Sequence, residues 1–352
     1  MNAEDAVLVR LEGRALHLTL NRPRVLNALD HAMVRRLDEA LAEAATDPAV
    51  STVIIAGAGE RGLCAGGDIR TLHDDARAGG RASLDFWRDE YRLNARIHRF
   101  GKPYVALMDG IVMGGGVGVS GHGSVRIVTE RSRVAMPETG IGFVPDVGGT
   151  RLLALAPGEL GTHLALTGTP VGAADAILCG LADHHVPSDR LPALVTALAG
   201  CVTPEDVTRT VRAHAGEPAA GILGGRRVWI DRCYAAASVE EIIDRLGETG
   251  EPEAKETAEA LLALSPTALK VTLEAVRRAR RTASLEEALD QEYRVSAHAF
   301  AHPDFVEGVR ARIVDKDGDP RWSPHRLADV TTTDVEGFFA PLGAGELGLA
   351  RR

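Results

Sequence analysis

The glycine run Gly114–Gly116 constrains the fold of this chain more than any other sequence feature. It follows the apolar run Tyr104–Met108 and the pair Asp109-Gly110, so the order is a buried strand, a turn and the start of a helix. Without Cβ atoms, backbone N–H groups at a helix start can approach a ligand closely and point at negative charge. The sequence predicts a strand-turn-helix unit. Its turn either packs closely against neighbouring backbone or binds a ligand.

A second glycine-rich loop, residues 57–68, follows a second buried strand, the β-branched run Val50–Ala56. A helical pattern over 83–100 follows this loop and leads into the strand Tyr104–Met108. Strand, helix, strand and helix in this order imply right-handed crossovers, which would bring residues 62–68 beside Gly114–Gly116. N–H donors near Gly67 and Gly115 could then form an oxyanion hole. The alternative is that both glycine runs only permit close packing of strand and helix.

Two acids, Glu138 and Asp146, lie eight residues apart just downstream. The segment between and after them is punctuated by glycine and proline, so its backbone is expected to be irregular. Irregular backbone can aim two carboxylates at one point, which a regular helix would separate. Their structural alternatives are a helix cap after Pro137 for Glu138 and a turn role before Gly148 for Asp146.

Composition describes an ordinary globular protein of 352 residues, with 45% hydrophobic and 25% charged residues. A net charge of −9 argues against nucleic acid or an anionic membrane as a partner, and no apolar run reaches the roughly 20 residues of a membrane span. The N-terminal segment, with Glu4 and Asp5, lacks the plan of a secretory signal, so we expect a cytoplasmic protein. Four separated cysteines without a CxxC pair predict free thiols, and no metal site is expected.

The expected secondary structure changes after residue 150, where helical patterns dominate. We expect a core with the site over 1–200, a helical C-terminal region over 201–330 and a weakly structured tail over 331–352. The Gly/Ala-rich segment 215–225 is expected to be a surface connection.

Several segments in order resemble the enoyl-CoA hydratase/isomerase (crotonase) superfamily. They are LNRPRVLNAL (20–29), GLCAGGDI (62–69), GIVMGGGVG (110–118), MPETGIGFVPDVGGTRLL (136–153) and HPDFVEGVRARIVDKDGDPRW (302–322). The resemblance implies an α/β fold, a crotonase-like spiral of ββα units with an α-helical C-terminal region. It also implies a small-molecule acyl-CoA substrate, a homo-oligomer, and no cofactor, because coenzyme A is part of the substrate.

The resemblance also implies roles for single residues. Gly67 and Gly115 match the oxyanion-hole donors, Glu138 the main catalytic carboxylate and Asp146 the second acid or base. Glu90 matches a position of substrate contact, although a charged residue on a helix is more often simply solvated. Substrate-binding positions that border the CoA adenine are Ala65 and the stretch around Leu26.

One departure from the superfamily pattern bears on the reaction. Hydratases of the superfamily carry a glutamate three residues after the middle glycine of the triple-glycine turn, and here that position is Gly118. Asp146 stands where hydratases usually have glycine. The resemblance therefore favours hydrolysis of a small 3-hydroxyacyl-CoA thioester, with 3-hydroxyisobutyryl-CoA of valine catabolism as the implied substrate. A 3-hydroxypropionyl chain is equally compatible with the residues named. An enoyl-CoA hydratase or isomerase acting on another short acyl-CoA is the alternative.

Other classes of protein fit less well. Gly116, Gly118 and Gly121 satisfy GxGxxG, which suggests a dinucleotide-binding oxidoreductase, but the helix from Gly114 has room for only about ten residues. The sequence around Ser120 is not the GxSxG of serine hydrolases. A non-catalytic binding protein on the same fold remains open, and retention of both acids and both glycine turns argues against it.

Overall fold

The computed structural model describes residues 6–350, so the acidic start at Glu4 and Asp5 lies outside it. The chain divides into two compact units that alternate along the sequence. Unit 1 comprises 1–67, 89–135 and 171–221, and unit 2 comprises 68–88, 136–170 and 222–352. The expected division into 1–200 and 201–330 stays a prediction.

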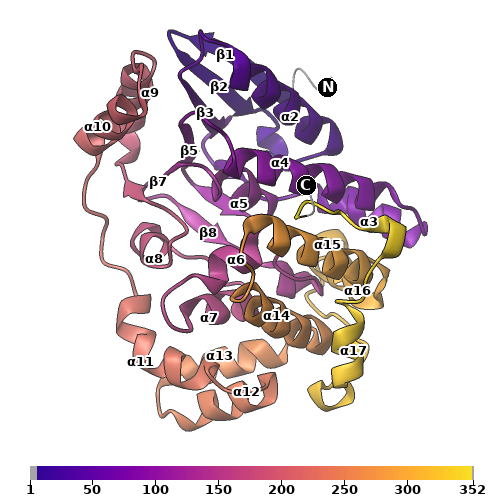
Figure 1. Ribbon diagram of the computed structural model, residues 1–352. Coiled ribbons are helices and arrows are strands. Elements are labelled where there is room, and N and C mark those ends of the chain that lie inside the picture. The colour runs from indigo at the N-terminus through magenta and orange to yellow at the C-terminus, as the bar shows by residue number, and fades with distance from the viewer. Residues whose placement is uncertain (1–5, 351–352) are drawn as a thin grey trace. The chain divides into compact units, whose positions relative to one another are not determined.

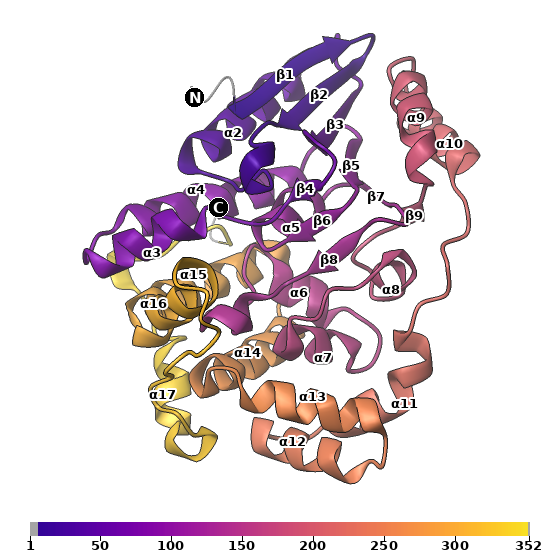
Figure 2. The ribbon, with the colours of Figure 1, turned by 180° about the vertical axis from the view of Figure 1, so that it is seen from behind.

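Unit 1 is built on a six-stranded sheet with the order β1-β2-β3-β5-β7-β9 (Figure 2). β1 and β2 form an antiparallel pair, and every later neighbour is parallel. The β-branched and aliphatic residues of the central strands are buried on both faces, as a parallel sheet requires. The strands are β1 (Val7–Glu12), β2 (Ala15–Leu20), β3 (Thr52–Gly57), β5 (Tyr104–Met108), β7 (Val125–Val128) and β9 (His184–His185).

A second, three-stranded parallel sheet in unit 1 has the order β4-β6-β8. Its strands are β4 (Gly62–Cys64), β6 (Ile111–Met113) and β8 (Arg133–Ala135). Each directly follows a strand of the large sheet, so β3-β4, β5-β6 and β7-β8 are successive pairs that divide between two sheets. The first two pairs lead into the helices α3 (Ile69–Arg77) and α5 (Gly115–Ser120), which makes the repeating ββα pattern.

Helices cover the large sheet of unit 1. α2 packs on β1 and β2. α9 and α10 lie side by side (Figure 1) and cover residues of β2, β3, β5 and β7. Leu194, Leu198, Val207 and Val211 of α9 and α10 share a buried cluster with sheet residues such as Ile54. The bounds are α2 (His31–Thr46), α5 (Gly115–Ser120), α8 (Ala173–Leu178), α9 (Leu191–Leu198) and α10 (Pro204–His214); α4 (Ala82–His98) contributes to both units.

Unit 2 is helical. Its helices are α3 (Ile69–Arg77), α6 (Gly149–Ala154), α7 (Leu160–Thr167), α11 (Leu223–Tyr234), α12 (Val239–Glu248), α13 (Pro252–Leu262), α14 (Pro266–Ala279), α15 (Leu285–Ala301), α16 (Pro303–Val309) and α17 (Thr332–Gly337). A 3₁₀ turn, η2 (Glu138–Ile141), and a π-helical turn, Arg310–Val314, add to them.

An aromatic cluster forms part of the core of unit 2. Trp87 stacks on Phe143 with ring centroids 5.2 Å apart, and Phe300 meets the Trp87 ring edge-on at 5.5 Å. Phe305 lies 5.4 Å from Phe143. Such pairs contribute about 0.5–1.5 kcal/mol each beyond the area they bury. Phe143 lies between Glu138 and Asp146 in the sequence, so this cluster ties the acid-bearing segment to α15 and α16.

The tail departs from expectation, because residues 331–350 are ordered and partly buried. Thr331 caps α17, and Val335, Phe338, Leu347 and Leu349 are buried. The expectation of a weakly structured tail is therefore wrong for these residues. Its apolar side chains are spaced too widely for a periodicity signal, and only the surface of unit 2 gives them a place to pack.

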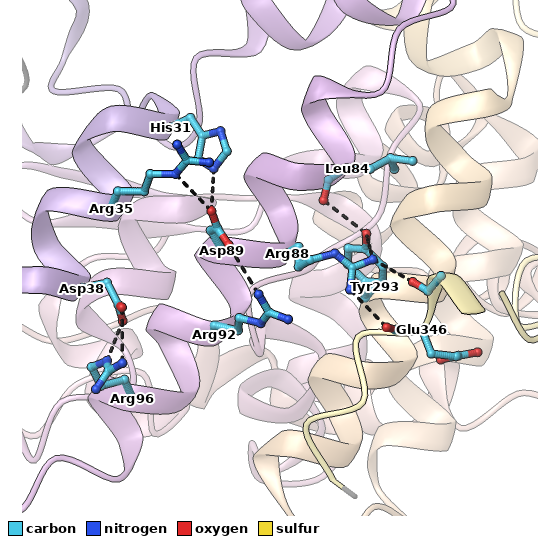
Figure 3. A network of polar contacts seen from close by, with 11 residues as sticks. His31, Arg35, Asp38, Leu84, Arg88, Asp89, Arg92, Arg96, Tyr293 and Glu346 are labelled. Carbon is cyan, nitrogen blue, oxygen red and sulfur yellow. Dashed lines mark hydrogen bonds and ion pairs between the residues drawn. The ribbon is translucent and has the colours of Figure 1, made fainter. Parts of the chain in front are cut away.

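Polar contacts also hold this tail (Figure 3). Arg88 donates to the carbonyls of Gly345 and Glu346 at 2.8 and 3.1 Å and to the Tyr293 hydroxyl at 2.9 Å. The Glu346 carboxylate accepts from Arg294 at 2.9 Å. One arginine thus binds both the tail and α15.

Helix α11 is a second difference, since it begins at Leu223, inside the 215–225 segment that was expected to be a surface connection. It covers the buried His163 of α7. The imidazole meets the rings of Trp229 and Tyr234 edge-on, with centroids 5.8 and 5.0 Å away. Burial, with a smaller effect of Arg226, lowers the pKa of His163 to about 4.

This histidine makes the stability of the protein depend on pH. Below pH 6.5 the His163 imidazole becomes protonated in the unfolded chain. In the folded protein it stays neutral until about pH 4. We expect the free energy of unfolding contributed here to be fully present above pH 6.5 and to fall by on the order of 3 kcal/mol as the pH drops to 4. Urea unfolding of His163→Phe should show a flatter pH dependence over this range. The exposed His325→Phe should behave as wild type; equal slopes for all three proteins would contradict the assignment.

Candidate active site

The two glycine turns of unit 1 meet, as the sequence predicted. Strand β4 pairs with β6, which places Cys64 opposite Val112. A Cβ built on Gly115 would lie 3.4 Å from the backbone nitrogen of Gly67, and one built on Gly66 would lie 3.6 Å from the nitrogen of Gly115. Gly115 is the first residue of α5, where N–H groups have no acceptor within the helix.

The close approach of these turns depends on glycine at Gly116. A Cβ at this position would lie 2.4 Å from the carbonyl oxygen of Cys64, which is backbone and cannot move aside cheaply. Gly66 has φ +113°, a conformation that other residues rarely adopt. The packing role of the glycines is therefore real, and it is the means by which the Gly67 and Gly115 backbones come together.

Glu90 faces this pair of turns. It lies on α4, is 2% exposed, and its Oε1 lies 2.6 Å from the position of a Cβ on Gly115. The neighbouring Asp89 binds α2 instead, accepting from His31 at 2.7 Å and from Arg35 at 3.3 Å (Figure 3). Asp89 thus anchors the helix face beside Glu90. The alternative of a solvated Glu90 does not hold, because its side chain is buried, and its contact with substrate stays a prediction.

Leu26 and Ala65 also lie together. The amide of Ala65 donates to the carbonyl of Leu26 at 3.0 Å. Leu26 and Asn27 both have positive φ, at 54° and 55°. Asn27 offsets this strain through its buried amide, which donates to the carbonyls of Ala58 and Gly62. The two positions expected near the CoA adenine therefore lie on two loops that are hydrogen-bonded to each other.

Two other nucleophile types near the glycine turns are excluded by their surroundings. Burial raises the pKa of the Cys64 thiol to about 12, so the thiolate is not accessible near neutral pH. The Ser120 hydroxyl is buried in α5 and donates to the carbonyl of Gly116 at 2.6 Å, which occupies its proton.

The helix that carries the GxGxxG match is only six residues long, so a dinucleotide-binding unit does not fit.

Glu138 begins the 3₁₀ turn η2 of unit 2 and is 7% exposed. Close backbone contacts hold the turn in place. A Cβ on Gly142 would lie 2.3 Å from the carbonyl oxygen of Asp304, and one on Gly308 would lie 2.3 Å from the carbonyl carbon of Ile141. The carboxylate is thus carried by a turn pressed against α16.

Asp146 lies in the next turn and is 5% exposed. Its carbonyl accepts from the Gly149 amide at 2.6 Å. Val147 has φ 52° and Gly148 has φ 81°. A β-branched residue in the left-handed region is strained by about 1–3 kcal/mol, so other contacts must hold this turn.

Sequence reasoning missed one carboxylate near Asp146. Glu292 on α15 is 1% exposed and accepts from the amides of Gly148 and Thr150 at 2.6 and 2.9 Å, and from the Thr150 hydroxyl. The available signal was a charged residue inside an apolar stripe, because Leu285, Leu289, Glu292 and Ser296 share one buried helix face.

The described residues hold no group of three or more metal-binding side chains, and their four cysteines are free and buried. Between residues 6 and 350, no helix is both long and apolar enough to cross a bilayer.

The glycine contacts lead to a stability prediction. We expect Gly116→Ala to lower the free energy of unfolding by about 1–3 kcal/mol, because the new methyl meets backbone of β4. Gly115→Ala should lower it less, since the nearest atom is the end of the Glu90 side chain, which can rotate. Urea unfolding at one pH measures both variants. A Gly116→Ala protein as stable as wild type would show that the turns do not depend on this contact.

Comparison with known proteins places this geometry in a family. Residues 15–339 match the profile of the enoyl-CoA hydratase/isomerase family. A carnitinyl-CoA dehydratase from Mycobacterium thermoresistibile is 51% identical in sequence, with a TM-score of 0.93 over 97% of this chain and 98% of that one. An enoyl-CoA hydratase from Rhodobacter sphaeroides is 46% identical, with a TM-score of 0.89 over 97% and 99%.

A curated relative carries a different name. The mitochondrial 3-hydroxyisobutyryl-CoA hydrolase of Rattus norvegicus is 42% identical over 348 residues, which cover 97% of this chain and 90% of the relative. The structural neighbours confirm the expected crotonase-like fold of ββα units with a helical C-terminal region. The chain belongs to the enoyl-CoA hydratase/isomerase family.

Proposed function

We propose that this protein hydrolyses the thioester of a small 3-hydroxyacyl-CoA, with 3-hydroxyisobutyryl-CoA as the substrate and 3-hydroxyisobutyrate and CoA as the products. The observation that carries the proposal is Gly118. It stands where hydratases of the family carry a carboxylate, and it is buried inside α5. A glycine there offers no group to hold water for addition to a double bond. The 42% identical rat hydrolase supports the same reaction.

The chemistry needs two kinds of group. In hydrolysis, oxygen from water joins the carbonyl carbon, the carbon–sulfur bond breaks and the sulfur takes a proton. N–H donors stabilise the negative carbonyl oxygen that forms in between, and one such donor contributes about 2.7–4 kcal/mol to transition-state binding. We assign this role to the amides of Gly67 and Gly115, whose backbones lie side by side in unit 1.

The carboxylates supply the attack and the proton transfer. Glu138 either deprotonates the attacking water or attacks the carbonyl itself, which forms a mixed anhydride that water then opens. Asp146 orients the water or protonates the leaving sulfur. Glu90 beside Gly115 is assigned to substrate contact, and Leu26 and Ala65 to the border of the CoA adenine. The burial of all three acids supports these roles, because water does not screen a buried charge.

The names of the two solved structures favour a second candidate, hydration or dehydration at the acyl chain. Those proteins are more similar to this chain than the rat hydrolase is, and their names are carnitinyl-CoA dehydratase and enoyl-CoA hydratase. Both reactions leave the thioester intact. The two candidates therefore differ in a directly measurable product, free thiol.

The remaining proposals concern surroundings. No cofactor is proposed beyond the coenzyme A of the substrate, and a homo-oligomer is proposed from the family resemblance, to be measured by light scattering. A cytoplasmic location stays a prediction, since the rat relative is named mitochondrial. The net charge of −9 supports neither nucleic acid nor an anionic membrane as a partner.

The central test follows two readouts on three substrates. With 3-hydroxyisobutyryl-CoA, a thiol reagent should show stoichiometric release of CoA. With crotonyl-CoA and carnitinyl-CoA, the ultraviolet absorbance of the conjugated enoyl group should stay nearly unchanged. All three substrates share the CoA handle, so only transition-state contacts separate them. A rapid change in enoyl absorbance with no thiol formed would replace the hydrolase with the second candidate.

The carboxylate at Glu138 can be tested by one substitution. Glu138→Gln keeps the shape but can neither accept the proton nor attack, so kcat should fall by about 10²-fold or more while KM changes little. The matched control is Glu248→Gln, which neutralises an exposed glutamate on α12. A purified Glu138→Gln protein with wild-type turnover would remove Glu138 from the mechanism.

A further inference from the structure

Glu292 is a buried carboxylate to which the proposed chemistry gives no task. It projects from α15 and is 1% exposed. One carboxylate oxygen accepts from the Gly148 amide at 2.6 Å, and the other accepts from the amide and the hydroxyl of Thr150. Both oxygens are therefore bonded, one to Gly148 in the turn after Asp146 and the other to Thr150 in the first turn of α6.

The backbone of that turn is strained, because Val147 and Gly148 both have positive φ. Valine is disfavoured there by its branched side chain. Within the turn, the Gly149 amide donates to the Asp146 carbonyl at 2.6 Å. Glu292 lies 144 residues further along the chain than Gly148, and its two oxygens hold the amides on either side of Gly149.

The charge of Asp146 reaches Glu292 as well. Burial raises the pKa of Glu292 to about 8; bonds from Thr150 and Gly148 act against this rise, and the Asp146 carboxylate adds to it. The two carboxyl groups are thus close enough to influence each other electrostatically. Tertiary structure has brought a buried acid that accepts three hydrogen bonds close to the acid that the proposed mechanism uses.

We propose that Glu292 is a positioning residue for thioester hydrolysis, which holds the strained Asp146–Thr150 turn and so aims the Asp146 carboxylate. The inference rests on the proposed function in that it gives Asp146 a part in the reaction. Glu292 itself touches no reacting atom and acts only through Asp146. A purely structural role, as an anchor between α15 and α6, is the competing explanation.

The chain offers a matched control on the same helix. Asp290, two residues earlier, is also buried and also accepts from two backbone amides, those of Leu349 at 2.8 Å and Ala350 at 3.1 Å. Its partners lie in the C-terminal tail. Asp290→Asn therefore removes a comparable buried acid without touching the Asp146 turn.

The test compares Glu292→Gln, Asp290→Asn, Asp146→Asn and the double variant Asp146→Asn/Glu292→Gln. A glutamine has only one acceptor oxygen, so at least one amide of the turn loses its partner. We expect kcat of Glu292→Gln for CoA release to fall by about tenfold or more with KM within about twofold. Asp290→Asn should stay near wild type. The double variant should be no slower than Asp146→Asn alone, because Glu292 acts through Asp146.

A second measurement does not depend on turnover. Amide hydrogen exchange of the peptide covering 145–152 should accelerate in Glu292→Gln and stay unchanged in Asp290→Asn, which should instead loosen 347–350. Unchanged exchange over 145–152, unchanged kcat, or a double variant whose losses multiply would each overturn the inference. If the wild-type protein releases no thiol, the proposed function fails and the positioning role in hydrolysis fails with it. The exchange data then still decide whether Glu292 holds the turn after Asp146 in place.

Discussion

The contact between Gly116 and the carbonyl of Cys64 is the constraint on which the organisation of unit 1 depends. No side chain fits between these two backbones, since a methyl on Gly116 would lie 2.4 Å from the Cys64 oxygen. Only this separation lets β4 and β6 pair with the turn after each strand beside the other. The same contact aligns the backbones of Gly67 and Gly115 and turns the start of α5 toward Glu90. Packing and the proposed binding of an oxyanion are therefore two consequences of one arrangement.

Unit 2 solves a different problem, which is to hold two buried carboxylates in irregular backbone. The turn with Glu138 is fixed by the close approach of Gly142 and Gly308 to neighbouring backbone and by the aromatic cluster around Phe143. The turn with Asp146 is fixed by directed hydrogen bonds to Glu292. Rigid support from helices on both turns is what an acid or base needs, because its reaction depends on distance and angle.

The relatives illustrate why fold and overall identity do not decide the reaction. A dehydratase, a hydratase and a hydrolase by name all match this chain over at least 97% of its length. All three are named for CoA thioesters, and one fold can support different reactions because the chemistry depends on few side chains. In this chain those side chains are a glycine at 118 and an aspartate at 146. In the proposed function, both residues favour hydrolysis over addition of water to a double bond.

Much of this arrangement was predictable from the sequence, because it follows from local physics. The apolar runs at 52–57 and 104–108 are strands, the glycine turns after them meet, and the acids lie in irregular backbone. Glycine conformation, β-branched runs and strand order are properties of neighbouring residues, and connection rules extend them to adjacent elements. The family resemblance added the roles of single residues, which local physics does not provide.

Other features were decided only by the tertiary structure. β4, β6 and β8 have three residues each, too few for periodicity, and they exist because they pair with one another. The tail at 331–350 is held in place because Arg88 donates hydrogen bonds to it and its apolar side chains pack on unit 2. Glu292 meets its partners across more than 140 residues. In each case the stabilising energy comes from contacts between distant segments, whereas a sequence pattern reports the preferences of near neighbours.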